Sequence, residues 1–321
     1  MLLKTSWRIR INEEEFIMKR TTFFFLIGLL AVLILGIHAV FAGEDSAAFY
    51  STSYDIETGE ETAYAVPENG DSHTDRTEGR EASPITGVTD LFAVSLVKPD
   101  ADIPPYTIFY PDDREIVRFS PDNQPYINIT RITTNKGSCS GFMIGPHYVA
   151  TAAHCLYDDE AQKWAGDFKI CPSYSKGNSP YGCAGASHLW ILDSGINREY
   201  DVGVIQLDKD LGTRTGWLGS WVISDSQTKD YAMILGYASD YDMDYMFYSY
   251  GYLQGTARNG NMLLYKMDDL PGSSGGPIVM PYGDNNYTYV VGIIVSENDE
   301  YNFAVRMTDT VYDFLHDFWG K

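Results

Sequence analysis

The sequence predicts an all-β protein of the sandwich or barrel kind that ends in one short helix. From residue 106 onward, short runs rich in β-branched and aromatic residues alternate with turns that contain Gly, Pro and Asn. The expected strands cover residues 126–132, 142–144, 148–152, 201–207, 231–235, 262–265, 287–295 and 303–307. Near the C-terminus, apolar residues recur at the helical period and predict a short amphipathic helix. Its apolar face consists of Val311, Phe314, Leu315, Phe318 and Trp319.

The composition is that of a folded, acidic protein. The chain has 321 residues, of which 44% are hydrophobic and 14% aromatic, and this is ample for a core. Its formal net charge is -21, so we expect no nucleic-acid partner, because phosphate binding needs a basic surface. The sequence contains no P-loop, dinucleotide fingerprint or metal-ligand spacing. We therefore expect neither a cofactor nor a metal.

The N-terminus has the layout of a secretory signal peptide. A short basic region precedes an apolar run over residues 23–37, and a small-residue cleavage site ends at Ala42. This pattern predicts that residues 1–42 are a signal peptide and that the protein is exported. Met18 is a possible start of translation. The alternative is an uncleaved anchor, since the apolar run nearly reaches membrane-spanning length.

Residues 43–105 are expected to form an acidic pro-segment. The stretch 43–84 is rich in Glu, Asp, Ser, Thr and Gly and has no periodicity, which predicts a poorly ordered spacer. Residues 88–97 are more apolar and are a candidate strand by which the pro-segment docks. A Pro-rich stretch follows, and we expect processing near residues 98–106.

The four cysteines follow the signal and all lie within residues 139–183. Because an exported protein meets an oxidising environment, two disulfides are expected, and four cysteines allow three pairings. The alternative is that two or more remain free thiols.

Three short segments carry residues suited to nucleophilic catalysis. Residues 151–155 are Thr-Ala-Ala-His-Cys, residues 200–205 are Tyr-Asp-Val-Gly-Val-Ile, and residues 271–277 are Pro-Gly-Ser-Ser-Gly-Gly-Pro. Each segment alone has an ordinary explanation: a packed histidine, a strand cap or a flexible loop. Their joint occurrence in an exported all-β chain favours a catalytic role.

The three segments supply the parts of a catalytic triad. A serine hydroxyl is a poor nucleophile and needs a base that is itself held in one tautomer. His154 is the expected base for Ser274, since an imidazole titrates near neutrality, and Asp201 is expected to orient it. In the Gly-rich turn, the backbone N–H groups of Gly272 and Ser274 are expected to converge on a carbonyl oxygen as an oxyanion hole.

These segments resemble the three signature blocks of the chymotrypsin-like serine peptidases. Within that superfamily the chain is most similar to the bacterial glutamyl endopeptidases, including the staphylococcal V8-type and bacillary enzymes. The similarity is strongest over residues 137–158, and it extends to residues 112–114, 267–268 and 301–302. It covers about residues 106–321.

The resemblance implies a double six-stranded antiparallel β-barrel with a short C-terminal helix. The barrels would cover about residues 106–210 and 211–321, with His154 and Asp201 on the first and Ser274 on the second. It also implies a secreted serine endopeptidase, made as a zymogen. Such an enzyme acts on protein or peptide substrates, as a monomer, without stable membrane association after signal cleavage.

The resemblance further implies the disulfides Cys139–Cys155 and Cys171–Cys183. One departure concerns Ser273: many animal members have an Asp before the nucleophile, which binds the freed N-terminal amine, whereas bacterial glutamyl members lack it. That activation switch therefore cannot operate here in the same form.

A second departure concerns the pocket for the substrate side chain, P1. Glutamyl endopeptidases generally place a His on the pocket wall to bind the substrate carboxylate, whereas Ile294 takes this position here. Asp269 replaces a common Thr near the pocket base, and Ser296 belongs to the opposing wall. An apolar residue and an extra carboxylate disfavour a buried glutamate. We therefore expect a weaker preference for Glu, unless another group such as the mature N-terminal amine neutralises it.

Two other functions fit the same residues. An inactive homologue could serve as an extracellular binding module, although such proteins usually lack a triad residue and this chain has all of them. An esterase could use the same triad, but nothing in the sequence favours it over a peptidase.

Overall fold

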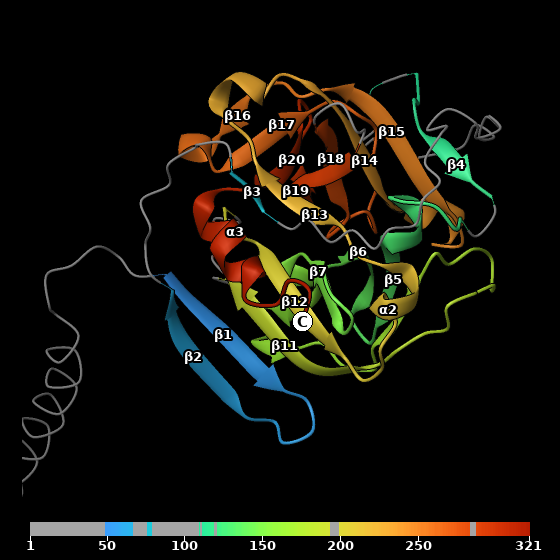
Figure 1. Ribbon diagram of the computed structural model, residues 1–321, viewed down its shortest axis with the longest axis vertical. Coiled ribbons are helices and arrows are strands. Elements are labelled where there is room, and N and C mark those ends of the chain that lie inside the picture. Colours follow the sequence, from blue (N-terminus) through green and yellow to red (C-terminus); the bar gives the residue numbers. More distant parts are fainter. Residues whose placement is uncertain are drawn as a thin grey trace, which may run out of the picture. The chain divides into compact units, whose positions relative to one another are not determined.

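Two sheets built almost entirely from antiparallel strands dominate the computed structural model (Figure 1). The structure describes residues 49–66, 76–78, 109, 111–118, 121–192, 199–282 and 287–321. In the described part, the first sheet has the strand order β10-β5-β6-β7-β12-β11-β1-β2. The main path of the second sheet is β16-β17-β20-β19-β18-β14-β15-β4, with β13 and β3 joined beside β19. The predicted all-β class is therefore correct.

The strands of the first sheet are β1 (Phe49–Asp55), β2 (Glu61–Val66), β5 (Ile129–Thr134), β6 (Gly137–Met143), β7 (Tyr148–Thr151), β10 (Lys169–Pro172), β11 (Ala186–Leu192) and β12 (Val202–Leu207). Those of the second sheet are β3 (Arg76–Glu78), β4 (Glu115–Val117), β13 (Gly219–Val222), β14 (Tyr231–Tyr237), β15 (Met246–Tyr252), β16 (Thr256–Ala257), β17 (Met262–Tyr265), β18 (Pro277–Tyr282), β19 (Tyr287–Glu297) and β20 (Asn302–Arg306). A small hairpin consists of β8 (Tyr157–Asp158) and β9 (Lys163–Trp164).

The sheets correspond to the two expected six-stranded barrels with additions. In the first, the six strands from β10 to β11 are extended by the hairpin β1–β2. In the second, the six neighbouring strands from β17 to β15 along the main path are extended by β16 at one end and β4 at the other. β-branched and aromatic side chains are buried inside both sheets, as the alternation of apolar residues along their strands requires.

The predicted strands agree with the structure in place and differ at their ends. The run 126–132 begins with a 3-10 turn, Tyr126–Asn128, before β5. Several strands were missed, among them β10, β11, β13, β15 and β18. These strands are recruited by pairing with their neighbours, a tertiary effect that local propensity does not contain.

The expectation of a poorly ordered spacer over residues 43–84 is wrong for part of that stretch. Residues 49–66 form the hairpin β1–β2, and residues 76–78 form β3. The hairpin contains alternating Tyr, Thr and Ser residues, a pattern that its acidic, glycine-containing surroundings obscured. The candidate docking strand at residues 88–97 lies outside the described residues.

The predicted C-terminal helix is present as α3 (Asp309–His316). The hydroxyl of Thr308 accepts a hydrogen bond from the N–H of Val311 at 3.4 Å and caps its first turn. Val311, Phe314 and Leu315 are buried in the core, as expected. The helix ends earlier than the apolar pattern, but Phe318 still packs on first-barrel aromatics, Tyr148 and Trp190. A single helical turn, α2 (Gly212–Thr215), lies between the two sheets in sequence.

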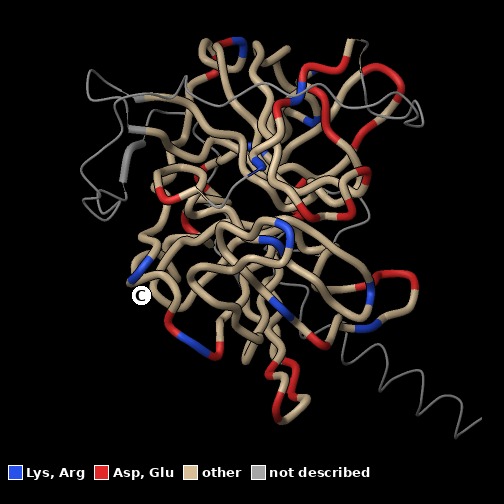
Figure 2. Tube along the Cα trace, turned by 90° about the vertical axis from the view of Figure 1, so that its right-hand side faces the viewer, with Lys and Arg blue, Asp and Glu red and all other residues tan. Residues whose placement is uncertain are grey.

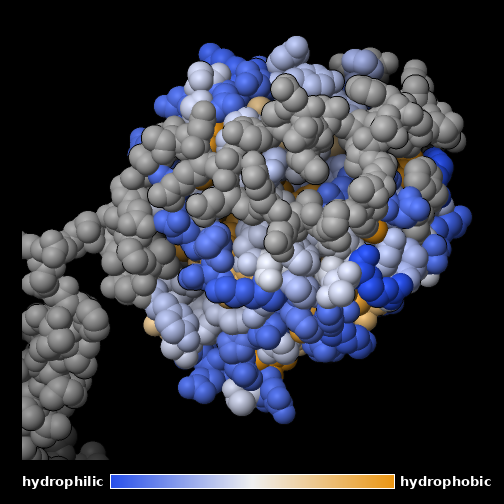
Figure 3. Space-filling view, viewed as in Figure 1, coloured by the Kyte–Doolittle hydropathy of each residue, from blue (hydrophilic) through white to orange (hydrophobic). Residues whose placement is uncertain are grey.

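The described surface is mainly polar. Figure 3 shows one face that is largely hydrophilic outside its grey part, and Figure 2 shows Asp and Glu on loops of both sheets. Tyr64, Tyr231 and Tyr252 are the large hydrophobic residues exposed among those described. No helix in the described ranges is both long and apolar enough to cross a membrane.

Candidate active site

His154 and Asp201 are joined through two hydrogen bonds. His154 lies in a 3-10 turn, Ala153–Cys155, directly after β7, and Asp201 directly precedes β12, which pairs with β7. Nδ1 of His154 lies 2.7 Å from Oδ2 of Asp201, and its backbone N–H donates to Oδ1 at 2.9 Å. The Asp201 side chain is 5% exposed and that of His154 is 29% exposed. The buried carboxylate therefore fixes an imidazole whose other nitrogen is free to face solvent or substrate.

The glycine at position 203 lets β12 approach the histidine turn closely. A Cβ at Gly203 would stand 2.6 Å from Cδ1 of Leu156, closer than such atoms pack. The Asp-Val-Gly-Val pattern thus combines the carboxylate with the residue that lets its strand lie against the turn bearing His154.

Ser274 lies in a tight turn that only glycines allow. Gly272 and Gly275 have φ values of 105° and 85°, in the region that favours glycine. A Cβ at Gly275 would stand 2.1 Å from Oγ1 of Thr151, and one at Gly272 would stand 2.4 Å from Sδ of Met243. In the described part of the chain, the N–H groups of Gly272 and Ser274 donate to no protein acceptor. They are therefore available to a substrate oxygen.

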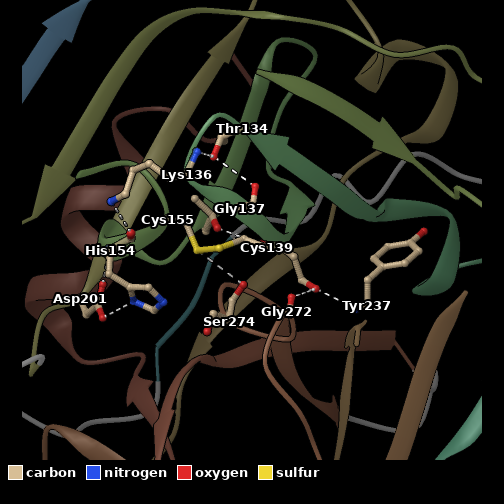
Figure 4. Close-up of a disulfide and its surroundings, with 12 residues drawn as sticks. Thr134, Lys136, Gly137, Cys139, His154, Cys155, Asp201, Tyr237, Gly272 and Ser274 are labelled. Carbon is tan, nitrogen blue, oxygen red and sulfur yellow. Dashed lines mark hydrogen bonds and ion pairs between the residues drawn. A yellow bond between two sulfur atoms is a disulfide. The ribbon is translucent and has the colours of Figure 1, made fainter. Parts of the chain in front are cut away.

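The turn that carries Ser274 is anchored to the first sheet. The carbonyl oxygen of Ser274 accepts from the N–H of Ser140 on β6 at 2.9 Å and lies 3.8 Å from Sγ of Cys155. Figure 4 shows the imidazole of His154 between Asp201 and Ser274. The Ser274 hydroxyl forms no hydrogen bond with any described residue. To act as a nucleophile it must donate a hydrogen bond to Nε2 of His154. Such a bond is often long before substrate binds.

The structure contains the disulfides Cys139–Cys155 and Cys171–Cys183. These are the pairs that the resemblance implies, and among the described cysteines none is a free thiol. The first bridge ties β6 to the turn that carries His154. Three metal-ligating residue types also gather here, Cys139, His154 and Cys155, but the two sulfurs are bonded to each other and offer no thiolate.

Ser140 is a site residue that the sequence analysis missed. Its hydroxyl donates to the carbonyl oxygen of Gly272 at 2.9 Å and accepts from the N–H of Tyr237 at 2.8 Å. Its own carbonyl accepts from the hydroxyl of Thr151 at 2.7 Å. The only available signal was its place between Cys139 and Gly141, within the stretch 137–158 where the resemblance is strongest, and this does not indicate a contact so far along the chain.

The loop before Ser274 binds the start of the domain. The carboxylate of Asp268 accepts hydrogen bonds from the backbone N–H groups of Phe109 and Asp113, the latter at 2.8 Å. The Asp113 carboxylate in turn accepts from the N–H of Asp268 at 3.1 Å. Burial raises the pKa of Asp268 to about 7 against the lowering effect of these donors, and the Asp113 charge adds to the rise.

Arg114 holds the same segment from its other side. Its guanidinium binds the carboxylates of Asp112 at 2.9 Å and Asp240 at 2.7 Å, and it is fully buried. These two ion pairs raise the Arg114 pKa against the opposing effect of burial. The Asp112-Asp113-Arg114 motif therefore fastens the first described residues of the domain to the second sheet.

Of the three expected pocket residues, Asp269 and Ile294 are buried and Ser296 is half-buried. The hydroxyl of Tyr265 donates to Oδ2 of Asp269 at 2.6 Å. Burial raises the pKa of Asp269 to about 8, with a further contribution from the Glu297 charge, although the Tyr265 hydrogen bond opposes the shift. Ile294 belongs to the same apolar cluster as Leu270, which adjoins Asp269. The bulge of β19 between Ile294 and Ser296 separates the latter from this cluster.

Comparisons with known proteins agree with this geometry. A glutamyl endopeptidase of Bacillus licheniformis is 31% identical over 200 residues, covering 60% of this chain and 62% of that protein. A Bacillus subtilis protein named extracellular metalloprotease is 24% identical over 193 residues, covering 59% of this chain and 60% of that protein. The chain thus spans less than two thirds of the length of either curated relative.

Solved structures support the fold. A Glu endopeptidase in complex with MPD matches with a TM-score of 0.55 and 23% identity, over 64% of this chain and 96% of that chain. The thermostable serine protease AL20 matches with a TM-score of 0.50 and 19% identity, over 62% of this chain and 99% of that chain. The family model described as Trypsin matches residues 115–312, and these residues hold His154, Asp201 and Ser274. The chain belongs to the trypsin family, whose members are serine peptidases with the chymotrypsin fold.

Proposed function

We propose that this chain is the precursor of a secreted serine endopeptidase that hydrolyses peptide bonds through an acyl-enzyme intermediate. His154, Asp201 and Ser274 are its triad. The observation that carries the proposal is the double hydrogen bond between Asp201 and His154, beside a nucleophile turn with free N–H groups, within a trypsin-family domain.

The hydrogen bond to Asp201 places a proton on Nδ1 of His154 and leaves Nε2 as the base. Nε2 takes the proton of Ser274 while Oγ attacks the carbonyl carbon of the scissile bond. The imidazolium that forms is stabilised by the buried carboxylate. It then gives its proton to the leaving amine, and the acyl group remains on Oγ. Water, activated by the same nitrogen, reverses these steps and releases the acid.

The negatively charged oxygen of each tetrahedral intermediate must be stabilised by hydrogen-bond donors. The backbone N–H groups of Gly272 and Ser274 are suited to this role, since no described residue occupies them. Loss of one oxyanion donor typically costs about 2.7–4 kcal/mol in the transition state. A residue with a Cβ at 272 would meet Met243, so the turn that presents these donors depends on glycine.

The export and maturation of this chain are parts of the proposal. Two disulfides in the structure fit an oxidising destination. The proposed signal, residues 1–42, and the proposed cut near residues 98–106 rest on the sequence patterns. Intact mass of the active secreted protein tests both, with a mature chain starting close to Tyr106 expected. An active chain that still begins at Gly43 would contradict the maturation step.

The proposed substrates are proteins or peptides, and the P1 pocket is neutral to acidic. Ile294 offers no charge to a substrate glutamate, and the raised pKa of Asp269 makes it neutral at physiological pH. Substrates with a medium-sized apolar residue at P1 are then accepted. Cleavage after basic P1 residues becomes faster once Asp269 ionises. The proposed enzyme therefore has only a weak preference for Glu at P1, in contrast to a glutamyl endopeptidase.

Covalent labelling with a fluorophosphonate tests the chemistry. The wild-type protein should be labelled on Ser274, whereas Ser274→Ala should not be labelled. An unlabelled wild-type protein that is folded and fully processed would favour the alternative, an inactive homologue that binds partners outside the cell. A panel of matched peptides and esters separates a peptidase from an esterase.

A further inference from the structure

The hairpin β1–β2 completes the edge of the first sheet. β1 pairs with β11 from Ser51 opposite Leu192 to Asp55 opposite His188, and β2 pairs with the other side of β1. The N–H of Ile56 donates to the carbonyl of Ser187 at 3.1 Å and continues the contact beyond the strand. In Figure 1 the blue hairpin lies alongside β11. A segment of the proposed pro-region is thus part of the barrel sheet.

β11 pairs with β12 along one edge, from Ala186 to Leu192, so its other edge is open to β1. Between β10 and the strand that follows, the pairing in the described residues is a single bridge, Ile170 with Ala184, which lies before β11 begins. Without β1, the outward N–H and C=O groups over residues 188–192 would be unpaired. Such an edge is a template for another strand.

Side chains of the hairpin also belong to the barrel. Ser51 and Ser53 are 5% and 3% exposed, as buried as core residues. The ring of Tyr54 stacks on Trp164, with centroids 5.1 Å apart and planes 6° from parallel. The indole N–H of Trp164 donates to Oε1 of Glu61 at 2.6 Å. The indole is therefore held by both strands of the hairpin.

The same segment reaches the second sheet. β3 pairs antiparallel with β13, with Glu78 opposite Ser220 and Arg76 opposite Val222. β13 itself pairs with β19, which carries the pocket residue Ile294. The described parts of this segment, residues 49–66 and 76–78, therefore give strands to both barrels, and main-chain hydrogen bonds hold them at both places.

We propose that residues 49–78 stay bound to the peptidase domain after the chain is cut near residues 98–106. The mature protein is then a non-covalent complex of two chains, in which the short chain supplies strands to both sheets. The occupant of the β11 edge is this segment itself, since it is already seated there. The inference rests on the proposed maturation, but its test does not depend on activity.

A chain with a specific cleavage site inserted between residues 98 and 105 tests the proposal. The Ser274→Ala substitution is included so that the protein cannot cut itself, and a site-specific protease makes the single cut. The two fragments should co-elute on gel filtration and separate only in denaturant. Separate elution under native conditions would overturn the proposal. Fluorophosphonate labelling of the wild-type protein tests the proposed function separately from the retention of the short chain.

A matched pair of substitutions tests the docking mode in the same cut protein. Ser53→Lys introduces a charge at a buried position of β1 and should weaken retention of the short chain by about a hundredfold or more. Ala63→Lys, at an exposed position of β2, should leave retention unchanged. Equal retention in both variants would contradict docking through β1.

Amide hydrogen exchange gives a readout that needs no substitution in the hairpin. The N–H groups that β11 donates to β1 should exchange slowly before the cut and equally slowly after it. Rapid exchange over residues 188–192 after the cut would show that the strand has left, whatever the gel filtration shows.

Discussion

The hydroxyl of Ser140 donates a hydrogen bond to the carbonyl oxygen of Gly272, 2.9 Å away. This bond joins β6 of the first sheet to the turn that carries Ser274 on the second. The same Ser140 donates its backbone N–H to the carbonyl of Ser274. The three residues of the proposed triad therefore come from two sheets that are fastened at Ser274, and we expect Ser140 to act as a positioning residue.

Ser140→Ala should lower kcat more than it raises KM. The substitution leaves the carbonyl of Gly272 and the N–H of Tyr237 without their buried partner, which costs about 1–3 kcal/mol of stability. The loosened turn also misplaces the oxyanion donors. Steady-state kinetics and urea unfolding measure the two effects. Ser138→Ala, on the same strand but half-buried, is the control and should change neither quantity appreciably.

Ser274→Ala should reduce turnover by several orders of magnitude and leave the folded state intact, because the hydroxyl carries chemistry and little packing. Ser273→Ala, at the neighbouring serine, should be far milder. Peptide hydrolysis and circular dichroism of both variants check this. A severe loss of activity in Ser273→Ala together with a mild one in Ser274→Ala would mean that Ser273, and not Ser274, is the nucleophile.

The family, the all-β class and the triad segments could be predicted from the sequence because each is local. Gly272, Ser274 and Gly275 are adjacent, and the turn they form needs no distant partner. The contacts of Ser140 with Gly272 and of Asp268 with Asp113 could not be predicted, since each joins residues more than a hundred positions apart. The hairpin β1–β2 was missed for a related reason: its strand β1 is held by pairing with β11, more than a hundred positions along the chain.

The two disulfides should differ in what their removal affects. Replacing Cys171 and Cys183 by Ser opens the short loop between these two residues and should cost about 2–5 kcal/mol of stability. Replacing Cys139 and Cys155 should cost a similar amount and also lower kcat, since Cys155 adjoins His154. Thermal unfolding and kinetics on the double variants test this. Non-reducing peptide mapping that linked Cys155 to Cys171 would contradict both pairs.

The stability of the protein should fall as pH rises from about 4 to about 8. The folded-state pKa of Asp269 is raised to about 8, so between its ordinary value and 8 the folded state holds a proton that the unfolded state has released. This costs about 1 kcal/mol per pH unit in that window. Asp269→Asn should flatten the profile, and Asp242→Asn, at an exposed position, should not. Urea unfolding at several pH values between 5 and 9 measures the slope.

Asp268 adds to the same dependence below pH 7, because its pKa is raised to about 7. Asp269→Asn should therefore reduce the slope and leave a smaller one below about pH 7, which is the contribution of Asp268. A profile between pH 5 and 9 that is unchanged by Asp269→Asn would contradict the raised pKa of Asp269.

The choice of P1 residue should depend on pH through Asp269. With Ile294 at the pocket wall and a neutral Asp269, peptides with Leu at P1 should be cut at least as well as those with Glu at neutral pH. As pH rises through about 8, Asp269 ionises, and Lys at P1 should gain on Leu because the pocket acquires a negative charge. Matched peptides that differ only at P1 give kcat/KM at pH 6 and pH 9. Asp269→Asn should abolish the gain of Lys at pH 9 while leaving the ratio at pH 6 unchanged. A strong preference for Glu over both Leu and Lys would mean that another group, such as the mature N-terminal amine, neutralises the substrate carboxylate, and that Ile294 does not set the specificity.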